Sequence, residues 1–432
     1  MLPALLLSLA AFQAPAADDP GWPAWRGPLG TGVAPAADPP LRWSETENVR
    51  WKAELPGLGH STPIVSGDRI FLTAAEPFGD PLPPSAGHRD GEHDNLETVR
   101  RHKFLVLALD RAGGRVLWRR TAREALPHES GHRTGSLASN SPVTDGERVY
   151  AFFGSNGLFC LDRDGRPLWE KDLGRMHSHH AHGEGSSPAL HGDTLVVNWD
   201  HEEASFVVAL DKRTGRELWR VPRDEVTSWS TPLVVVHEGK PQVVVSATRR
   251  IRGYDLATGE VLWECGGLSR NVVASPVSAG GILIAGSSYE LRAMLAIRLE
   301  GARGDVTGTG QVLWKRDRNT PYVPSPLLYD EHLYFFSHYQ AVLSCLDPRT
   351  GEARYPPTRL HGAADFYASP IGAAGRVYAV SREGATVVLK HGPEPEVLAV
   401  NRLDDRFSAS PAAAGRELFL RGERRLYCVS GE

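Results

Sequence analysis

Eight Ser/Thr-Pro pairs recur along the 432-residue chain, and most successive pairs are close to 44 residues apart. We call each pair an anchor. An apolar run follows each anchor, and in most repeats three further short runs follow, separated by turns rich in Gly and Asp. Four short strands per repeat of this length are typical of propeller blades. The sequence therefore predicts an all-β protein, an eight-bladed β-propeller of four-stranded antiparallel blades. The anchor prolines are Pro63, Pro142, Pro188, Pro232, Pro276, Pro326, Pro370 and Pro411.

A second motif lies between the third and fourth strands of the repeat. It has the form Ala-x-Asp-x-x-x-Gly-x-x-x-Trp and is complete at 108–118 and 209–219. Asp can accept hydrogen bonds from turn amides, Gly can adopt a positive φ, and the indole can pack between neighbouring blades. With this motif the chain resembles the PQQ-like, quinoprotein-type β-propeller repeat family. The segment from Gly21 to Pro28 also resembles the lead-in of exported members. The resemblance implies the propeller fold over roughly 21–432 and leaves the function open.

The last repeat is one strand short, because only 21 residues follow Pro411. The segment from Val49 to Leu55 matches the fourth-strand pattern of 167–173. We therefore expect an N-terminal strand to complete the last blade, which leaves no free sheet edge. The predicted propeller spans 48–432, with a lead-in segment at 18–47 packing on it. A polar loop insert at 76–101 in blade one explains the long first spacing.

The sequence predicts a signal peptide at the N-terminus, residues 1–17. Its apolar run from Leu2 to Ala14 is shorter than the roughly 20 residues of a membrane span. Small residues at 14–16 resemble a cleavage site, although no Lys or Arg precedes the run. The first cysteine is Cys160, so no cysteine near the predicted cleavage site could carry a lipid anchor. We expect a periplasmic or secreted monomer without a membrane span, whose partners are proteins, peptides or small ligands. Its 48 basic and 52 acidic residues argue against nucleic-acid binding.

The four cysteines bear on cofactor chemistry. Cys160, Cys345 and Cys428 fall at equivalent third-strand positions of different blades, and Cys265 falls on a fourth strand. We therefore expect buried free thiols rather than disulfides. The family resemblance implies, for its catalytic quinoproteins, a vicinal disulfide over the quinone and a calcium held by Glu and Asn beside a catalytic Asp. Because this chain has no adjacent cysteine pair, PQQ is not expected. A relative of similar architecture, the outer-membrane-protein assembly propeller, implies a non-enzymatic scaffold.

One face of the predicted ring is rich in histidine. The loops between blades and the loops between second and third strands open on the same face, and 12 of the 17 histidines map there. Imidazoles and carboxylates together suit divalent transition metals. One interpretation is thus a metal site in the densest segment. The alternatives are a loop that caps the ring by hydrogen bonding, and one His, such as His132, that acts as a general base. The proposed metal ligands are His177, His179, His180, His182 and Glu184.

Residues close to the anchors are candidates for the channel mouth and could bind a cofactor or ligand. Two functions remain open. The first is an exported, non-catalytic scaffold that binds a protein or ligand on its His-rich face. The alternative is a quinone- or metal-dependent enzyme, similar to quinoprotein dehydrogenases, with its site on that face. The channel-mouth candidates are His60, His128, His132, Trp229, Arg270, Asn271, Tyr322 and Tyr367.

Overall fold

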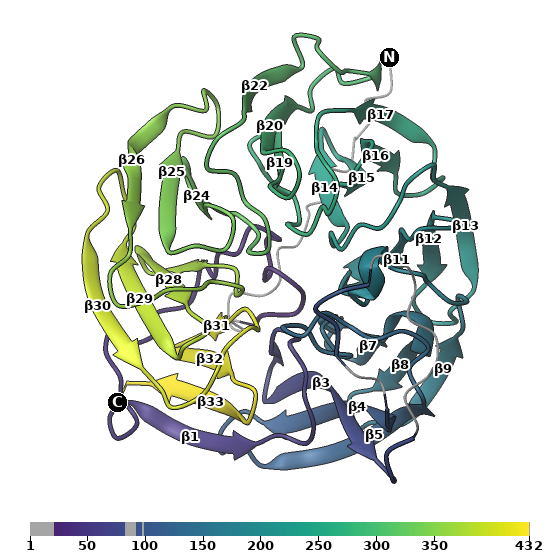
Figure 1. Cartoon of the computed structure of the whole chain (residues 1–432), viewed down its shortest axis with the longest axis vertical. Helices are drawn as coiled ribbons and strands as arrows, with labels where there is room; N and C mark the ends of the chain where they lie inside the picture. Colours follow the sequence, from purple (N-terminus) through teal and green to yellow (C-terminus); the bar gives the residue numbers. More distant parts are fainter. Residues whose placement is uncertain (1–20, 83–91, 97–98, 432) are drawn as a thin grey trace, which may run out of the picture.

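The computed structural model describes residues 21–82, 92–96 and 99–431, so the predicted signal peptide lies outside the described residues. Eight antiparallel sheets surround a central axis (Figure 1). The prediction of an eight-bladed β-propeller is confirmed. The two helices in the described part are single 3-10 turns, η1 (Gly154–Asn156) and η2 (His179–Ala181). Over those same residues, no helix has the length and apolar character needed to cross a membrane.

The strands of each blade are given from the strand that follows the anchor outward. The first four blades are blade one, β2 (Ile64–Ser66), β3 (Arg69–Phe78), β4 (Arg101–Asp110) and β5 (Val116–Ala125); blade two, β6 (Val143–Thr144), β7 (Arg148–Phe152), β8 (Leu158–Asp162) and β9 (Pro167–Lys171); blade three, β10 (Ala189–His191), β11 (Thr194–Trp199), β12 (Phe206–Asp211) and β13 (Glu217–Pro222); and blade four, β14 (Leu233–His237), β15 (Lys240–Val245), β16 (Ile251–Asp255) and β17 (Val261–Cys265), with β21 (Gly304–Asp305). The last four are blade five, β18 (Val277–Ala279), β19 (Ile282–Ser287), β20 (Ala293–Arg298) and β22 (Val312–Arg316); blade six, β23 (Leu327–Tyr329), β24 (His332–Phe336), β25 (Val342–Leu346) and β26 (Ala353–Arg359); blade seven, β27 (Ile371–Ala373), β28 (Arg376–Val380), β29 (Ala385–Lys390) and β30 (Val397–Arg402); and blade eight, β31 (Ala412–Ala414), β32 (Glu417–Arg421), β33 (Arg425–Ser430) and β1 (Val49–Glu54).

The position of a strand in its blade explains its sequence pattern. The two middle strands lie between neighbouring blades, so both of their faces are buried, as in β7 and β8. Such strands are apolar almost throughout. The outermost strand has one face toward solvent, and the exposure of β13 alternates residue by residue. The four cysteines are buried and free, as predicted.

The N-terminal strand closes the ring. β1 pairs antiparallel with β33 from Trp51 opposite Cys428 to Glu54 opposite Arg425, and the two strands lie side by side in Figure 1. The last blade thereby gains its fourth strand, as the sequence predicted. Blade four differs from the expected four strands, because the short β21, from the long connection of blade five, pairs in parallel with β17.

The strands of blade one extend further than the sequence indicated. β3 runs through Phe78 and β4 begins at Arg101, so the connecting segment is 79–100 rather than the whole of 76–101. The ladder continues to the pair formed by Phe78 and Arg101. Arg101 and Lys103 lie over the Phe78 ring at 5.8 and 5.2 Å from its centroid. These cation–π contacts explain why polar residues continue the strands.

In the described part of the chain, fourth-strand tryptophans join five of the eight blades to the next by an indole hydrogen bond. The Nε1 of Trp118 donates to the carbonyl of Arg163 at 2.9 Å, and Trp169 donates to Lys212 at 3.0 Å. The motif glycine lies under the indole of the preceding blade: a Cβ on Gly215 would come within 2.7 Å of the Trp169 ring. The motif therefore needs Gly both for its positive φ and for this close approach.

The anchors form a ring of hydrogen bonds around the axis. In seven of the eight blades, the backbone N–H of the anchor Ser or Thr donates to the hydroxyl of the next anchor at 2.9–3.0 Å. No such bond joins Ser410 of the last blade to Thr62 of the first, both in the described part of the chain, and the Thr62 hydroxyl has no partner. We call this junction the seam. There, Arg421 donates to the carbonyl of Ser61 at 3.2 Å, and Arg111 donates to Glu417 at 2.6 Å.

The described part of the lead-in segment crosses the centre of the ring (purple in Figure 1). The backbone of Trp22 pairs with Val65, with N···O distances of 2.8 and 2.9 Å. The Arg26 guanidinium donates to the anchor carbonyls of Pro326 and Pro370 at 2.8 and 2.9 Å. Burial lowers the pKa of Arg26 to about 9. The segment therefore closes one end of the central channel.

Candidate functional site

A cavity of about 200 Å³ lies in the channel, and residues from all eight blades form its wall. Each blade contributes the residue two positions before its anchor Ser or Thr. Side chains two positions apart in extended backbone point the same way, so these residues face the axis together with the anchor hydroxyls. We call the set the cavity ring. It consists of His60, Ser139, Gly185, Trp229, Val273, Val323, Tyr367 and Ser408.

The cavity ring is amphipathic. Blades eight, one and two contribute the polar Ser408, His60 and Ser139, whereas blades five and six, across the ring, contribute Val273 and Val323. Such a wall suits a ligand that is polar on one side and apolar on the other.

Two polar atoms in this wall lack hydrogen-bond partners. The Nε2 of His60 and the Oγ of Ser408 are shielded from solvent and unpaired. Burial, and then the charges of Arg421 and Arg382, lower the pKa of His60 to about 3, so its imidazole is neutral. The anchor hydroxyls that accept backbone N–H groups keep their own protons for donation. Since buried polar groups are normally paired, we expect a water molecule or a ligand atom to pair with each of them in solution.

The histidine-rich segment 177–184, here called the His loop, is held at the mouth of the cavity. The Nε1 of Trp229 donates to the carbonyl of Gly183 at 2.7 Å, and the N–H of His179 donates to Thr227 at 2.9 Å. Within the loop, His180 adopts φ 55° and Ala181 adopts φ 52°. Non-glycine residues pay a steric penalty in this region, so the surrounding contacts impose the conformation.

Glu184 ends the His loop and reaches the cavity wall. Its carboxylate accepts hydrogen bonds from the N–H of Ser155 at 2.6 Å and from the Ser155 hydroxyl at 2.5 Å. Burial raises the pKa of Glu184 to about 7, and the charge of Glu129 also raises it, whereas the bonds from Ser155 lower it. The carboxyl group can therefore exchange a proton near neutral pH.

The predicted metal ligands separate into two groups. The rings of His180 and His182 lie with those of His93 and His132, with centroids 4.7 Å apart for His132 and His182 and 4.5 Å apart for His93 and His180. The pKa of His182 is lowered to about 4, mainly by burial. His177 does not lie with these four histidines; it belongs to a second group of side chains.

His177 lies with His128 and Glu129. One potential ligand atom from each of these residues lies within 4.8 Å of the others, and this is the one such group of three or more in the described residues. The Nδ1 of His177 is 3.0 Å from Oε1 of Glu129. The structure thus brings one predicted metal ligand, His177, together with a predicted channel-mouth residue, His128.

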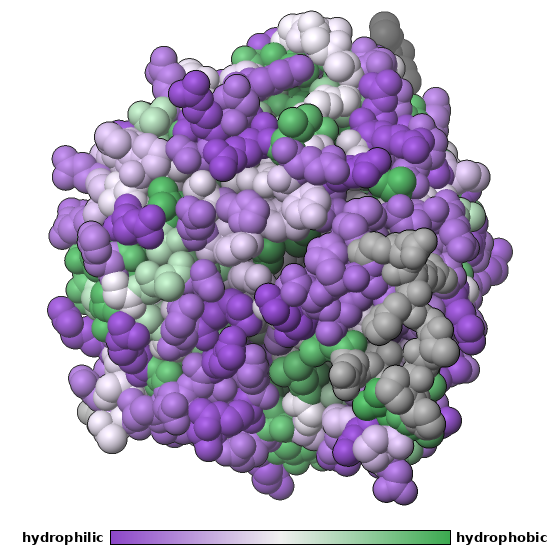
Figure 2. Space-filling view, in the orientation of Figure 1, coloured by the Kyte–Doolittle hydropathy of each residue, from purple (hydrophilic) through white to green (hydrophobic). Residues whose placement is uncertain are grey.

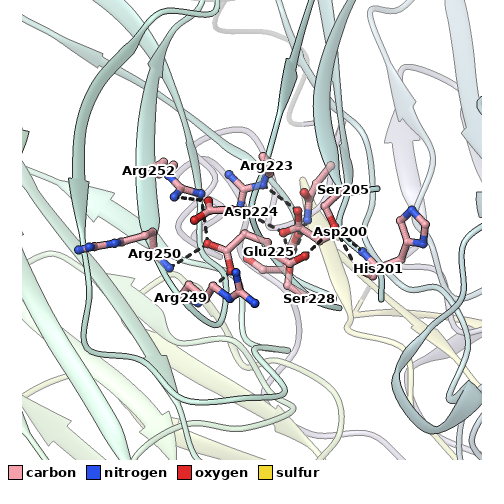
Figure 3. Close-up of polar contacts among 12 residues, drawn as sticks. Asp200, His201, Ser205, Arg223, Asp224, Glu225, Ser228, Arg249, Arg250 and Arg252 are labelled. Carbon is pink, nitrogen blue, oxygen red and sulfur yellow. Dashed lines mark hydrogen bonds and ion pairs between the residues drawn. The ribbon is translucent and has the colours of Figure 1, made fainter. Parts of the chain in front are cut away.

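A buried ion-pair network supports the His loop from blades three and four (Figure 3). Arg223 donates to both carboxylate oxygens of Asp200 at 2.7 and 3.1 Å, and neither side chain is exposed. Ser228 also donates to Asp200, at 2.7 Å. Glu225 accepts the N–H groups of two residues of the loop before β16, Arg249 and Arg250, at 2.8 and 2.9 Å. The network fixes the segment that carries Thr227 and Trp229.

Aromatic side chains cover the other side of the mouth. Tyr322 stacks on Tyr289 at 5.9 Å and lies 4.5 Å from the His338 ring, whereas Tyr339 and Tyr367 are 5.5 Å apart. Burial raises the pKa of Tyr322 to about 12. The mouth therefore has a histidine-rich half and a tyrosine-rich half.

Three of the eight channel-mouth candidates belong to the cavity ring: His60, Trp229 and Tyr367. The other five do not line the cavity. His128 and His132 lie in the two histidine groups, Tyr322 lies in the aromatic half, and Arg270 is exposed and 3.7 Å from Glu290. Asn271 is buried with φ 58°.

Sequence reasoning missed several wall residues. It did not select Ser139, Val273, Val323 or Ser408 as site residues, although each occupies the same position of the repeat as His60. Trp25 of the lead-in segment was not among the channel-mouth candidates either, yet its side chain lines the cavity and its indole N–H donates to the Ser275 hydroxyl at 3.2 Å. Aligning the eight anchors and comparing the position two residues earlier would have identified the ring.

The fold and this site define the class of the protein, an eight-bladed propeller of PQQ-like repeats around a central cavity. A family model described as "Outer membrane protein assembly factor BamB" matches residues 102–355 and 205–432. These matches cover more than half of the chain, which therefore belongs to this family.

Solved structures confirm the fold. BamB from Moraxella catarrhalis is 14% identical, with a TM-score of 0.53 over 84% of this chain and 98% of that chain. Quinohemoprotein alcohol dehydrogenase from Comamonas testosteroni is 9% identical, with a TM-score of 0.61 over 96% of this chain and 81% of that chain. A europium-containing methanol dehydrogenase is 11% identical, with a TM-score of 0.61 over 94% and 90%. A search of curated proteins finds no match.

The cavity wall does not fit a quinone cofactor of the PQQ type. That quinone carries several carboxylates, which need cationic partners in a buried site. Among the described residues, those that line the cavity include no Lys or Arg, and Glu184 adds an acidic group. In addition, the four cysteines are all free, so none forms a disulfide over the cavity.

Proposed function

We propose that this protein is an exported, non-catalytic binding scaffold that receives a protein side chain or a small ligand in the cavity at the His-loop end of its channel. The observation that carries the proposal is the cavity ring. Its wall is amphipathic, with the polar residues Ser408, His60 and Ser139 across the ring from the apolar Val273 and Val323. The occupant places a polar group toward His60 and an apolar group toward Val273 and Val323.

Two further observations support binding rather than chemistry. The loops at the mouth are held in place by many hydrogen bonds, so little ordering is required when a partner docks. On the face seen in Figure 2, hydrophilic side chains predominate and apolar ones are scattered. Affinity on such a face would come from polar contacts and from a group inserted in the cavity. The name of the matching family concerns outer-membrane protein assembly, which favours a protein partner and a periplasmic location.

Photo-cross-linking in the native compartment tests the proposal. A photoreactive amino acid at position 367 should give one discrete cross-linked species. Val323→Trp, which fills the apolar half of the cavity, should reduce this product at least about tenfold, because it excludes the inserted group. Val236→Trp is the matched control, since Val236 is 45% exposed on β14 and does not line the cavity.

Equal cross-linking in the two Trp variants would overturn the cavity as the binding site. The alternative function, a quinone- or metal-dependent enzyme, has its own readout. Protein supplied with PQQ and calcium, or with zinc, is assayed for reduction of an artificial electron acceptor by alcohols. Turnover that Val323→Trp abolishes would replace the scaffold with the enzyme.

A further inference from the structure

We infer that His128, Glu129 and His177 form a binding site for one divalent transition-metal ion, of the zinc class, between the two loops that connect blade two to blades one and three. The site goes beyond the binding role proposed above and is independent of it. His128 and Glu129 lie on the connection from β5 to β6, and His177 lies on the connection from β9 to β10. Two imidazoles and a carboxylate are a ligand set that zinc commonly uses when one coordination position is left open.

The geometry is already close to that of a bound ion. The potential ligand atoms all lie within 4.8 Å of one another. Around a tetrahedral ion with bonds of about 2.0–2.1 Å, neighbouring ligand atoms are roughly 3.3 Å apart. The separation of 3.0 Å between His177 Nδ1 and Glu129 Oε1 is close to this value. Small side-chain rotations would bring the third ligand into place.

Contacts behind the ligands hold them in position. The Nε2 of His128 is 2.7 Å from the carbonyl oxygen of Met176, which can only accept, so Nε2 carries the proton and Nδ1 keeps its lone pair. The other oxygen of Glu129 accepts the N–H and the hydroxyl of Ser178, both at 3.0 Å. Metal ligands in proteins typically have such outer partners.

The tripeptide Met176-His177-Ser178 therefore provides one ligand and the outer contacts of the other two. It is itself fixed, because the N–H of Met176 donates to Ser155 at 2.7 Å. The Glu129 side chain is only 6% exposed, and those of His128 and His177 are 17% and 22% exposed. The site is thus accessible to an ion while its carboxylate is largely desolvated, which strengthens its attraction for a cation.

Cobalt titration of the untagged, chelator-treated chain tests the site. We expect one Co²⁺ per chain, with the intense visible absorption of a tetrahedral ion, and displacement by one equivalent of Zn²⁺. Glu129→Gln and His128→Asn should each abolish the spectrum. Ser178→Ala, which removes an outer contact, should weaken Zn²⁺ binding about 10–100-fold.

His179→Ala is the matched control, because His179 lies in the same loop but outside the ligand group. It should keep the full spectrum. Circular dichroism of each variant separates loss of the site from loss of the fold, and the titration of the unchanged chain stands even if a variant unfolds. Absence of stoichiometric Co²⁺ or Zn²⁺ binding by that chain would overturn the site. So would retention of the spectrum in Glu129→Gln together with its loss in His179→Ala.

Discussion

At the scale of single residues, the mouth of the channel depends on charges that are buried but paired. Asp200 and Arg223 are fully buried and linked by two hydrogen bonds. Such pairs contribute little net stability compared with apolar residues, but breaking one leaves an uncompensated charge in the interior. Their value here is positional, since Ser228, one residue before Trp229, also donates to Asp200.

Arg223→Met should therefore lower the free energy of unfolding by about 3–5 kcal/mol, because it leaves the Asp200 carboxylate buried and unpaired. Urea denaturation measures the change. Arg213→Ala, which removes an exposed ion pair with Asp193, should cost at most about 1 kcal/mol. The double variant Asp200→Asn/Arg223→Met should lose less than Arg223→Met alone. A larger loss in the double variant would contradict this account.

His60 should make the protein sensitive to acid. Its pKa is lowered from 6.5 to about 3 in the folded state, so between these values the unfolded chain binds a proton that the folded chain does not. Stability from this group is complete above pH 6.5 and falls as the pH drops toward 3, by about 2 kcal/mol at pH 5. His60→Gln should reduce the difference in unfolding free energy between pH 7 and pH 5 by that amount. An unchanged difference in urea midpoints would show that His60 titrates normally.

At the scale of the structural element, the turn glycine and the tryptophan of the preceding blade act as one unit. Gly215 combines φ 70° with a close approach to Trp169, whereas Gly192 has φ 55° with open space around it. The two positions separate backbone strain from packing.

Gly192→Ala should cost roughly 1–2 kcal/mol, the strain of a left-handed residue. Gly215→Ala should cost roughly 1–3 kcal/mol more, because the added methyl group displaces the Trp169 indole. Thermal denaturation and the fluorescence of the tryptophans measure both effects. Equal losses in the two variants would mean that the indole yields without cost.

Elements were the level at which the sequence was most informative. Repeating anchors and the Trp motif predicted the blades and the closing strand, because both are local patterns: the anchors recur eight times, and the Trp motif is complete in two repeats. The metal group was not predicted as a set, since His128 and His177 are 49 positions apart and only the packing of two loops joins them. The densest histidine run was predicted to hold the metal instead, but the His180 and His182 rings lie 5.4 Å apart and are not part of the group that contains His177.

At the scale of the whole molecule, β1 determines whether the ring is closed. The N–H of Leu55 donates to Arg424 of the last blade at 2.9 Å. Because alternate residues of an antiparallel strand donate to the same neighbour, the Ala53 N–H also faces β33, whereas that of Lys52 faces the outer edge.

Ala53→Pro should therefore open the last blade, while Lys52→Pro, on the solvent side of an edge strand, should be tolerated. We expect a loss of stability at least about 2 kcal/mol larger for Ala53→Pro, from the lost ladder bond and the unpaired carbonyl. The freed edge of β33 should also promote association. Thermal denaturation and light scattering on a sizing column measure the two effects; similar behaviour of the two variants would contradict the role of β1.

The seam makes the eight junctions between blades unequal. Seven are tied at the axis by an anchor hydrogen bond, whereas the eighth relies on Arg421 and Arg111 reaching across from the last blade and the first. Thermal motion should separate neighbouring blades most easily at the junction that lacks the anchor hydrogen bond. Native-state hydrogen exchange should therefore be fastest, among the buried first strands, in β2 and β31. Transient separation of β2 and β31 would open a single gap beside His60 and Ser408. The polar side of the cavity would then be reachable from between two blades as well as from the mouth.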